Sequence, residues 1–383
     1  MKNVLLVFGG ASYEHDISVI TAIQIYKKTK LKDVKLNLLY ISRDEKFYIC
    51  DEKKVVVDDF SKANFNGNPK KFKEVFFVSG EKQKLFVKTH FGLKEYMQVS
   101  VAVFACHGGN GENGKLVSYF DYNGIACSAG SSDALAICMD KFIFKKVAKG
   151  LGIPVVQGFR VNKIDYKKNL SDIMKRLKIM KFPVIIKSNS GGSSIGVFVA
   201  NDIDEFHSKI KEVFELDESA IVEKYIEHTR EFNIAVMGDK EKFEISKIDE
   251  PIKNDDLLSF SDKYLSGNSK SKKGQKSMDN SLRKFPADIS EKLSKQISQI
   301  ARKVFLSLNL QGIVRIDFLY QEKQDKLYIC EVNAIPGSLA YYFFKRNYIV
   351  TNDLIERLID IAEKNYRPKI VNSSLIVDVL IKK

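Results

Sequence analysis

Short apolar runs alternate with longer amphipathic runs along the first third of the chain. The runs NVLLVFGG (3–10), VKLNLLYIS (34–42) and VSVAVFACHGG (99–109) have strand length, whereas ISVITAIQIYKKTK (17–30) has helical spacing. Strands that alternate with helices predict an α/β domain with a mostly parallel sheet, which we assign to residues 1–132.

A lysine-rich stretch at about 51–98 interrupts this alternation. Within and beside it, KFYICDEKK (46–54) and EVFFVSGEKQKLFVKT (74–89) resemble hairpins. We interpret the stretch as an insertion in the first domain.

A helix is predicted from the segment SSDALAICMDKFIFKKVAKGLGIP (131–154). Ser and Asp precede its periodic part, two glycines end it, and a proline follows. It leads into a second domain, residues 133–228, in which KFPVIIKSNSGGSSIGVFVA (181–200) reads as strand, glycine-rich turn and strand.

The remaining residues, 229–383, form a third predicted domain. It contains the hairpin QGIVRIDFLYQEKQDKLYICEVN (311–333) and the amphipathic helix TNDLIERLIDIAEKNYRP (351–368). The predicted fold class is therefore α/β, with α+β lobes following the first domain along the chain.

Composition excludes several classes of protein. The chain is 44% hydrophobic and 29% charged, and none of its apolar runs reaches the roughly 18 residues that span a membrane. Its five cysteines form no CxxC pair, which favours buried thiols and a cytoplasmic location. The net charge of +14 permits anionic partners, but the lysines are spread along the chain apart from a cluster at 269–276. Without a zinc-finger or RNA-binding motif, we expect a solvated basic surface, no nucleic-acid partner and no membrane partner.

Four polar side chains are expected on one face of the hairpin at 311–333. Arg315 and Asp317 are two residues apart, as are Glu331 and Asn333, so antiparallel pairing can bring all four together. Oxygen ligands beside a guanidinium suit Mg²⁺ that bridges phosphates. The alternative is an Arg–carboxylate ion pair on a solvated sheet face.

Three glycine-rich turns follow strand-like runs. SNSGGSSIG (188–196) has no P-loop pattern, but its backbone N–H groups and the preceding Lys187 suit phosphate binding; the alternative is an ordinary flexible turn. The other two turns, 8–18 and 106–114, contain Glu14, and His107 with Glu112. Glu14 can act on a helix dipole or reach a cleft, and His107 is more often a structural residue than a base.

Together these stretches resemble the D-alanine–D-alanine ligase family of the ATP-grasp superfamily. The matching motifs follow one another in family order and cover nearly all of the chain: GGASYEHDIS, HGGNGENG, MDK, KSNSGGSSIG, VEKYIEHTREF, DKYLS, RIDF and EVNAIPG. The resemblance implies an ATP-grasp fold in which an N-terminal parallel α/β domain precedes two ATP-grasp subdomains.

The resemblance also implies roles for individual residues. ATP would be bound by Lys141, Lys187, Ser194, Glu223, Lys224, Tyr225, Ile226, Glu231 and Lys263. Two Mg²⁺ ions, with Mn²⁺ as a substitute, would be held by Asp317, Glu331 and Asn333. D-Alanine binding and oxyanion stabilisation would fall to Glu14, Ser193, Tyr264, Arg315 and the backbone N–H of Gly337.

The implied reaction joins two D-alanines through an acyl phosphate, in the cytoplasm, for peptidoglycan precursors. Homodimers are common in the family. Two departures are visible: Tyr342 stands where many members have a serine for the second substrate's carboxylate, and Ser188 where proline is usual. The alternatives are a ligase that takes D-lactate or D-serine as second substrate, and a non-catalytic nucleotide-binding ATP-grasp protein. Tyr264 disfavours the first, and the intact set of lysines and metal ligands disfavours the second.

Overall fold

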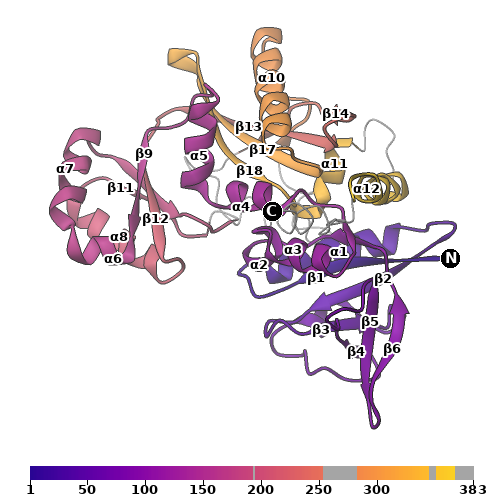
Figure 1. The fold of residues 1–383 in the computed structure, drawn as a ribbon. Helices are drawn as coiled ribbons and strands as arrows, with labels where there is room; N and C mark the ends of the chain where they lie inside the picture. The colour runs from indigo at the N-terminus through magenta and orange to yellow at the C-terminus, as the bar shows by residue number, and fades with distance from the viewer. Residues whose placement is uncertain (193–194, 253–282, 345–350, 367–383) are drawn as a thin grey trace, which may run out of the picture.

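The computed structural model describes residues 1–192, 195–252, 283–344 and 351–366 of the 383. Figure 1 shows three groups of elements: an N-terminal part, a lobe set to one side, and a C-terminal part that lies against the N-terminal one.

The N-terminal part is built on a six-stranded, mostly parallel sheet, as predicted. Its strand order is β4-β3-β2-β1-β7-β8, and β1 is parallel to both of its neighbours. Residues 4–8 of β1 are fully buried, because helices cover both faces of a parallel sheet. The strands are β1 (Lys2–Gly9), β2 (Val34–Ile41), β3 (Phe47–Cys50), β4 (Phe72–Val75), β7 (Val101–Phe104) and β8 (Ala126–Cys127). The helices are α1 (His15–Lys28), η1 (Val57–Phe60), α2 (Gly109–Glu112) and α3 (Lys115–Tyr122).

The two predicted hairpins of the insertion differ in outcome. The predicted hairpin at 74–89 is confirmed at one bridge, where Phe76 and Phe86 exchange two backbone hydrogen bonds of 2.8 Å. β5 (Lys84–Thr89) also pairs with β6 (Gly92–Gln98) in a separate two-stranded sheet. The segment 46–54 forms no hairpin of its own. Its strand β3 instead pairs with β2 and β4 and extends the main sheet, because Phe72 and Val75 of β4 are buried there.

The central lobe, which we define as residues 158–224, has a four-stranded antiparallel sheet in the order β11-β10-β12-β9. The predicted strand–turn–strand unit is confirmed as β10 and β11. The strands are β9 (Gly158–Asn162), β10 (Val184–Ser188), β11 (Val197–Ala200) and β12 (Ser219–Lys224). The helices are α6 (Lys163–Lys168), α7 (Leu170–Met180) and α8 (Ile203–Phe214).

The C-terminal part contains a second antiparallel sheet, in the order β14-β13-β17-β18. The predicted hairpin is confirmed as β17 and β18, and the predicted amphipathic helix as α12. The strands are β13 (Thr229–Gly238), β14 (Phe243–Ile245), β15 (Glu250–Pro251), β16 (Arg283–Lys284), β17 (Gly312–Gln321) and β18 (Lys326–Asn333). The helical elements are α10 (Glu291–Ser307), η3 (Glu322–Gln324), η4 (Gly337–Ala340), α11 (Tyr341–Phe344) and α12 (Thr351–Asn365).

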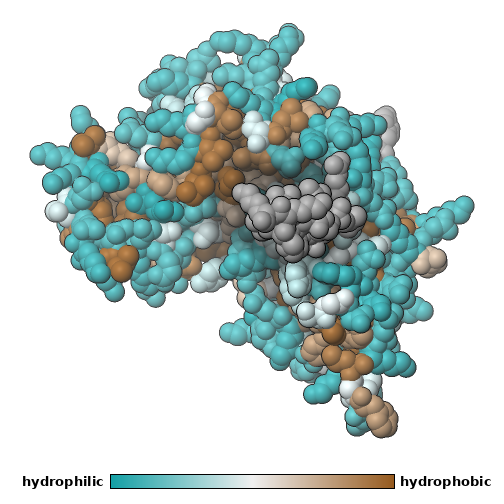
Figure 2. Space-filling model, in the orientation of Figure 1, coloured by the Kyte–Doolittle hydropathy of each residue, from teal (hydrophilic) through white to brown (hydrophobic). Residues whose placement is uncertain are grey.

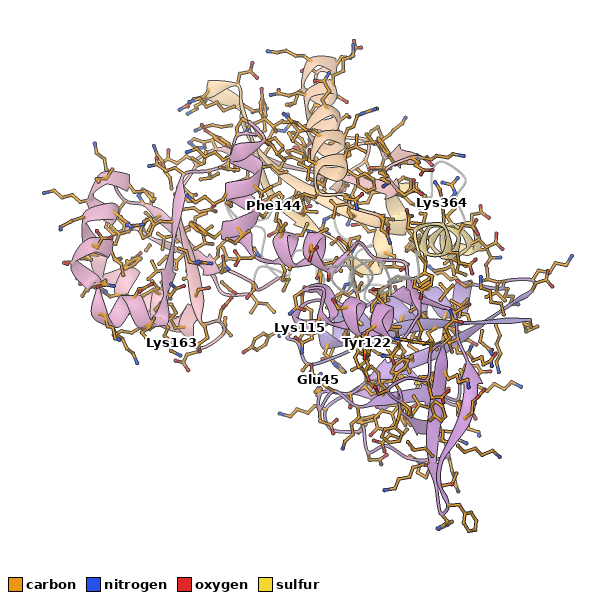
Figure 3. The ribbon with its side chains drawn as sticks, viewed as in Figure 1. Glu45, Lys115, Tyr122, Phe144, Lys163 and Lys364 are labelled. Carbon is orange, nitrogen blue, oxygen red and sulfur yellow. The ribbon has the colours of Figure 1, made fainter. Side chains whose placement is uncertain are left out.

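The single helix predicted at 131–154 is wrong, because the segment forms two helices. α4 (Ser132–Met139) and α5 (Lys141–Gly150) are separated at Asp140, whose backbone is extended. The Asp140 carboxylate accepts the N–H of Ile143 at 2.8 Å and so caps the second helix. Both helices pack on β18, and Phe144 of α5 is almost fully buried (Figure 3).

Two hydrophobic cores divide the molecule. The larger core joins apolar side chains of the N-terminal and C-terminal parts with those of α4 and α5, whereas the smaller core lies within residues 159–222. Figure 2 shows hydrophilic residues over most of one face, with hydrophobic residues gathered around α5. Among the described residues, no helix is both long and apolar enough to cross a membrane.

Candidate active site

The β17–β18 hairpin presents four polar side chains on one face, as predicted. The register places Arg315 opposite Asn333 and Asp317 opposite Glu331. Arg315 binds Asp317 through Nε and Nη2, both at 2.8 Å, and Asn333 Nδ2 donates to Asp317 Oδ2 at 3.1 Å. The Arg–carboxylate ion pair of the alternative interpretation is therefore present, between Arg315 and Asp317. Glu331 and Asn333 add two further side chains with oxygen atoms on the same face.

These donors fit a hard divalent cation. Because the Asn333 nitrogen donates to Asp317, its oxygen is left as the atom that can bind a cation. The Glu331 side chain is 25% exposed and accessible from the pocket described below. No cluster of three or more His, Cys, Asp or Glu side chains suited to a metal occurs among the residues that the structure describes.

A pocket with about 390 Å³ of empty space, part of it open to solvent, brings together residues from all three parts of the chain. Predicted site residues make up much of its lining. They are Glu14, Lys141, Glu331 and Asn333, joined by Glu112, Cys138, Met139, Gly191, Gly192 and Val332.

Glu14 lies where the loop after β1 meets the glycine-rich turn. A Cβ atom on Gly192 would come within 2.4 Å of Glu14 Oε2, and one on Gly108 within 2.8 Å of the same oxygen. The absence of side chains at these two positions therefore lets the carboxylate reach the pocket.

Lys141 stands at the first turn of α5 and links the central lobe to the β17–β18 hairpin. Its ammonium donates to the carbonyl oxygen of Gly191 and lies 3.6 Å from Glu331 Oε2. Its backbone N–H donates to the carbonyl of Asn189 at 3.0 Å. The break before α5 thus sets the position of this lysine.

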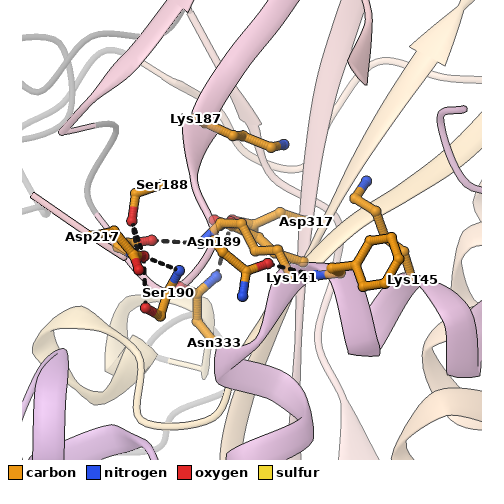
Figure 4. Close-up of polar contacts among 12 residues, drawn as sticks. Lys141, Lys145, Lys187, Ser188, Asn189, Ser190, Asp217, Asp317 and Asn333 are labelled. Atoms are coloured by element: carbon orange, nitrogen blue, oxygen red, sulfur yellow. Dashed lines mark hydrogen bonds and ion pairs between the residues drawn. The ribbon is translucent and has the colours of Figure 1, made fainter. Parts of the chain in front are cut away.

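The glycine-rich turn is anchored by Asp217, a residue that the sequence analysis did not single out. Asp217 Oδ2 accepts the hydroxyls of Ser188 and Ser190 at 2.6 and 2.7 Å, and the Ser190 N–H at 2.8 Å (Figure 4). The Ser188 hydroxyl in turn accepts the Gly191 N–H at 2.8 Å. Ser188, the departure from the usual proline, therefore helps to hold the turn. The predicted residues Ser193 and Ser194 lie outside the described residues.

Glu223 is buried between two lysines. Its carboxylate lies 2.6 Å from Lys145 Nζ and 2.7 Å from Lys187 Nζ. Burial alone would raise the pKa of Glu223, but the two ammonium groups outweigh it and lower this pKa to about 2. Burial would likewise lower the pKa of Lys187, but Glu223 reverses the effect and raises it. Glu223 and Lys187 are therefore both charged inside the protein.

The other residues expected around the nucleotide line the end of β12 and the start of β13. The Lys224 N–H donates to the carbonyl of Gln157 at 3.0 Å, so this N–H is already used within the sheet. Tyr225 and Ile226 follow β12 directly and are half-buried, as is Glu231 on β13. Lys263 and Tyr264, like the lysine cluster at 269–276, lie outside the described residues.

The segment after β18 is held by the N-terminal part through His107. His107 Nδ1 lies 2.9 Å from the carbonyl oxygen of Ile335, which places the ring proton on Nδ1. Its Nε2 then accepts the Thr21 hydroxyl at 3.0 Å, and that hydroxyl accepts the Ser338 N–H at 3.1 Å. His107 is therefore a satisfied structural residue, and burial lowers its pKa. Gly337, the predicted oxyanion donor, lies within this tethered segment.

Glu112, the last residue of α2, holds the same segment. Its Oε1 accepts the Ile335 N–H at 3.3 Å and its Oε2 accepts the Gly108 N–H at 3.1 Å. Burial, and next the charge of Glu14, raise the pKa of Glu112 to about 7. The sequence offers no sign of this role, since nothing local connects Glu112 to a residue more than 200 positions away.

Tyr342, one of the two departures named in the sequence analysis, is buried beneath Arg283. The Arg283 guanidinium lies 4.4 Å from the centre of the Tyr342 ring, and its Nη1 lies 3.2 Å from Asp249 Oδ2. Burial raises the pKa of Asp249 to about 6. The Arg283 guanidinium therefore packs against the ring of Tyr342.

Two antiparallel sheets, one carrying the glycine-rich turn and the other the acidic hairpin, define an ATP-grasp protein, a class of ATP-dependent ligases. Family models for the D-Ala–D-Ala ligase N-terminus and C-terminus match residues 3–130 and 147–360. The chain belongs to the D-alanine–D-alanine ligase family.

Individual relatives match over nearly their whole length. A D-alanine–D-alanine ligase of Thermosipho africanus is 33% identical over 96% of this chain and 95% of its own, and one of Helicobacter pylori is 30% identical over 97% of both. The crystal structure of a Helicobacter pylori D-alanine–D-alanine ligase, 26% identical, superposes with a TM-score of 0.72 over 96% of this chain and all of its own. The structure of the Coxiella burnetii enzyme, 22% identical, has a TM-score of 0.76 over 100% and 98% of the two chains and shares the fold.

Proposed function

We propose that this protein joins two D-alanines into D-alanyl-D-alanine at the expense of ATP, and so supplies a precursor of peptidoglycan. The observation that carries the proposal is the shared pocket in which Glu14, Lys141, Glu331 and Asn333 meet from three parts of the chain. We divide the chain into a substrate domain at 1–132 and two ATP-grasp subdomains at 133–228 and 229–383. The protein acts in the cytoplasm as a homodimer.

ATP lies between the two antiparallel sheets. Lys141 and Lys187 neutralise its phosphates, with Ser194 and Lys263 beside them. Glu223, Tyr225 and the backbone of Lys224 and Ile226 surround the adenine, and Glu231 binds the ribose.

Asp317, Glu331 and Asn333 hold two Mg²⁺ ions, with Mn²⁺ as a substitute. Bound there, the ions neutralise the charge that develops on the transferring phosphoryl group. Arg315 orients Asp317 through two of its five N–H donors, and Asn333 donates to the same carboxylate. The chain thus presents the carboxylate in a fixed direction before any ion binds.

Glu14 pairs with the ammonium of the first D-alanine, and Ser193 and Tyr264 complete this subsite. The carboxylate of that D-alanine attacks the γ-phosphate, giving an acyl phosphate and ADP. The amine of the second D-alanine then attacks the acyl carbon and releases phosphate. Arg315 and the Gly337 N–H stabilise the oxyanion, and a donor of this kind contributes roughly 3–4 kcal/mol.

The test is ADP release by the purified protein with ATP and Mg²⁺, adding D-alanine, L-alanine, D-lactate or D-serine in turn. Release with D-alanine alone, with D-alanyl-D-alanine as product, is expected. Release only when D-lactate or D-serine accompanies D-alanine would reassign the second substrate. Nucleotide binding without release under any condition would favour a non-catalytic ATP-grasp protein.

A further inference from the structure

Lys145 has no part in the function proposed above, although it touches a residue that does. It lies on α5, and its Nζ is 2.6 Å from the carboxylate of Glu223, which is bound on its other side by Lys187.

A nucleotide in the pocket cannot contact the Lys145 ammonium directly. The Nζ atom is completely covered by protein, and the side chain is 7% exposed. Any effect of Lys145 on a bound nucleotide must therefore pass through Glu223.

The charges explain why a second lysine is needed. With Lys187 alone, Glu223 would form a neutral buried pair, and separating the pair would leave an uncompensated buried carboxylate. With Lys145 as a permanent partner, Glu223 stays compensated when Lys187 turns toward a phosphate. Lys145, Lys187 and Glu223 together carry two positive charges and one negative charge. A bound nucleotide would supply the negative charge that balances the second ammonium group.

The location of Lys145 adds a geometric role. Its helix α5 packs on β18, whereas Glu223 and Lys187 belong to the sheet of the central lobe. The Lys145–Glu223 contact therefore joins the two sheets that enclose the nucleotide.

We propose that Lys145 is a positioning residue of the nucleotide site: it fixes and neutralises Glu223, so that Lys187 is available to a phosphate of the nucleotide. This inference rests on the proposed placement of ATP between the two sheets.

The test uses Lys145→Met, which removes the charge from a side chain of similar length, and Lys145→Arg, which keeps the charge. Lys146→Met is the matched control, because Lys146 is the exposed neighbour whose ammonium lies over the Phe142 ring. The dissociation constant of ADP and the KM for ATP are expected to rise about tenfold in Lys145→Met, with an unchanged KM for D-alanine. Lys145→Arg should recover most of the loss, and Lys146→Met should match the wild type. An Lys145→Met protein with wild-type values for both nucleotides would overturn the proposal.

Two further variants separate this inference from the proposed site. If Glu223→Gln and Lys187→Met leave ADP affinity unchanged, the nucleotide site itself is misplaced; if they weaken it while Lys145→Met does not, only the role of Lys145 fails. In the Glu223→Gln background, Lys145→Met should add no further loss, and an added tenfold loss would contradict action through Glu223. If the single variant Lys145→Met does not fold, the comparison of Glu223→Gln with the double variant still tests the proposal. The double variant has no carboxylate at position 223 that would be left buried without a partner.

Discussion

Glu112 accepts the backbone N–H of Ile335 at 3.3 Å, across more than 200 residues of sequence. The contact joins the end of α2 to the segment after β18, two residues before Gly337. A half-buried carboxylate of the N-terminal part thus helps to set the direction in which the proposed oxyanion donor points.

The surroundings of Glu112 make stability depend on pH, because burial and the charge of Glu14 raise its pKa and outweigh the two backbone hydrogen bonds that lower it. Because the pKa of Glu112 is raised from 4.5 to about 7, the folded protein holds a proton between these pH values that the unfolded chain has released. The free energy of unfolding therefore decreases as pH rises through this window. Glu112→Gln cannot titrate, so thermal unfolding at pH 5 and pH 8 should show the variant gaining stability relative to the wild type at the higher pH. Parallel pH profiles of the two proteins would contradict the assignment.

Gly192→Ala is expected to weaken D-alanine binding. Its Cβ would lie 2.4 Å from Glu14 Oε2, so the carboxylate must move away from the pocket. Steady-state kinetics should show a KM for D-alanine raised about tenfold, the effect of losing roughly 1.4 kcal/mol of binding. Gly150→Ala is the control, because a Cβ there meets no atom within 4 Å. Equal effects of the two substitutions would refute the role of this contact.

Lys187→Met should reduce kcat/KM for ATP by about 100-fold, since it removes the ammonium that we propose to neutralise a phosphate. The control is Lys178→Met, in the exposed last turn of α7. Initial rates at varied ATP and saturating D-alanine give the comparison. If only the KM for D-alanine rises and kcat/KM for ATP is unchanged, Lys187 does not bind the phosphates of ATP.

Glu331→Gln is expected to raise the Mg²⁺ concentration needed for half-maximal activity about tenfold, because an amide oxygen binds a hard cation less strongly than a carboxylate. Asp325→Asn, at the exposed turn of the same hairpin, removes a carboxylate that instead pairs with Lys292. A Mg²⁺ titration of ADP release distinguishes them. An unchanged Mg²⁺ requirement in Glu331→Gln would remove Glu331 from the proposed ligands.

The acidic hairpin could be predicted from the sequence because side chains alternate between faces with a period of two. Arg315 and Asp317, and then Glu331 and Asn333, keep that period on both strands, so their common face follows once the strands pair. The break between α4 and α5 was harder to see. The hydrophobic pattern continues through Asp140, and only its capping contact with Ile143 marks the end of one helix and the start of the next.

Contacts between distant residues carried no such signal. Lys145 has the sequence context of a solvated helical lysine, and Asp217 that of a loop acid, until the fold brings them to Glu223 and to the glycine-rich turn. The hydrogen bonds of Glu112 likewise depend on a segment that only the completed fold brings close.

The division into two hydrophobic cores has a consequence for the order in which the growing chain can fold. The smaller core is complete once residues 159–222 have left the ribosome, whereas the larger core needs β17, β18 and α12 as well as the first sheet. Because α12 packs against β7 and β8, apolar surface of the first-made sheet stays uncovered until more than 350 residues have been synthesised. The first part of the chain to be synthesised is therefore the last to have its apolar surface buried. Until then that surface is exposed, and exposed apolar surface is what chaperones bind.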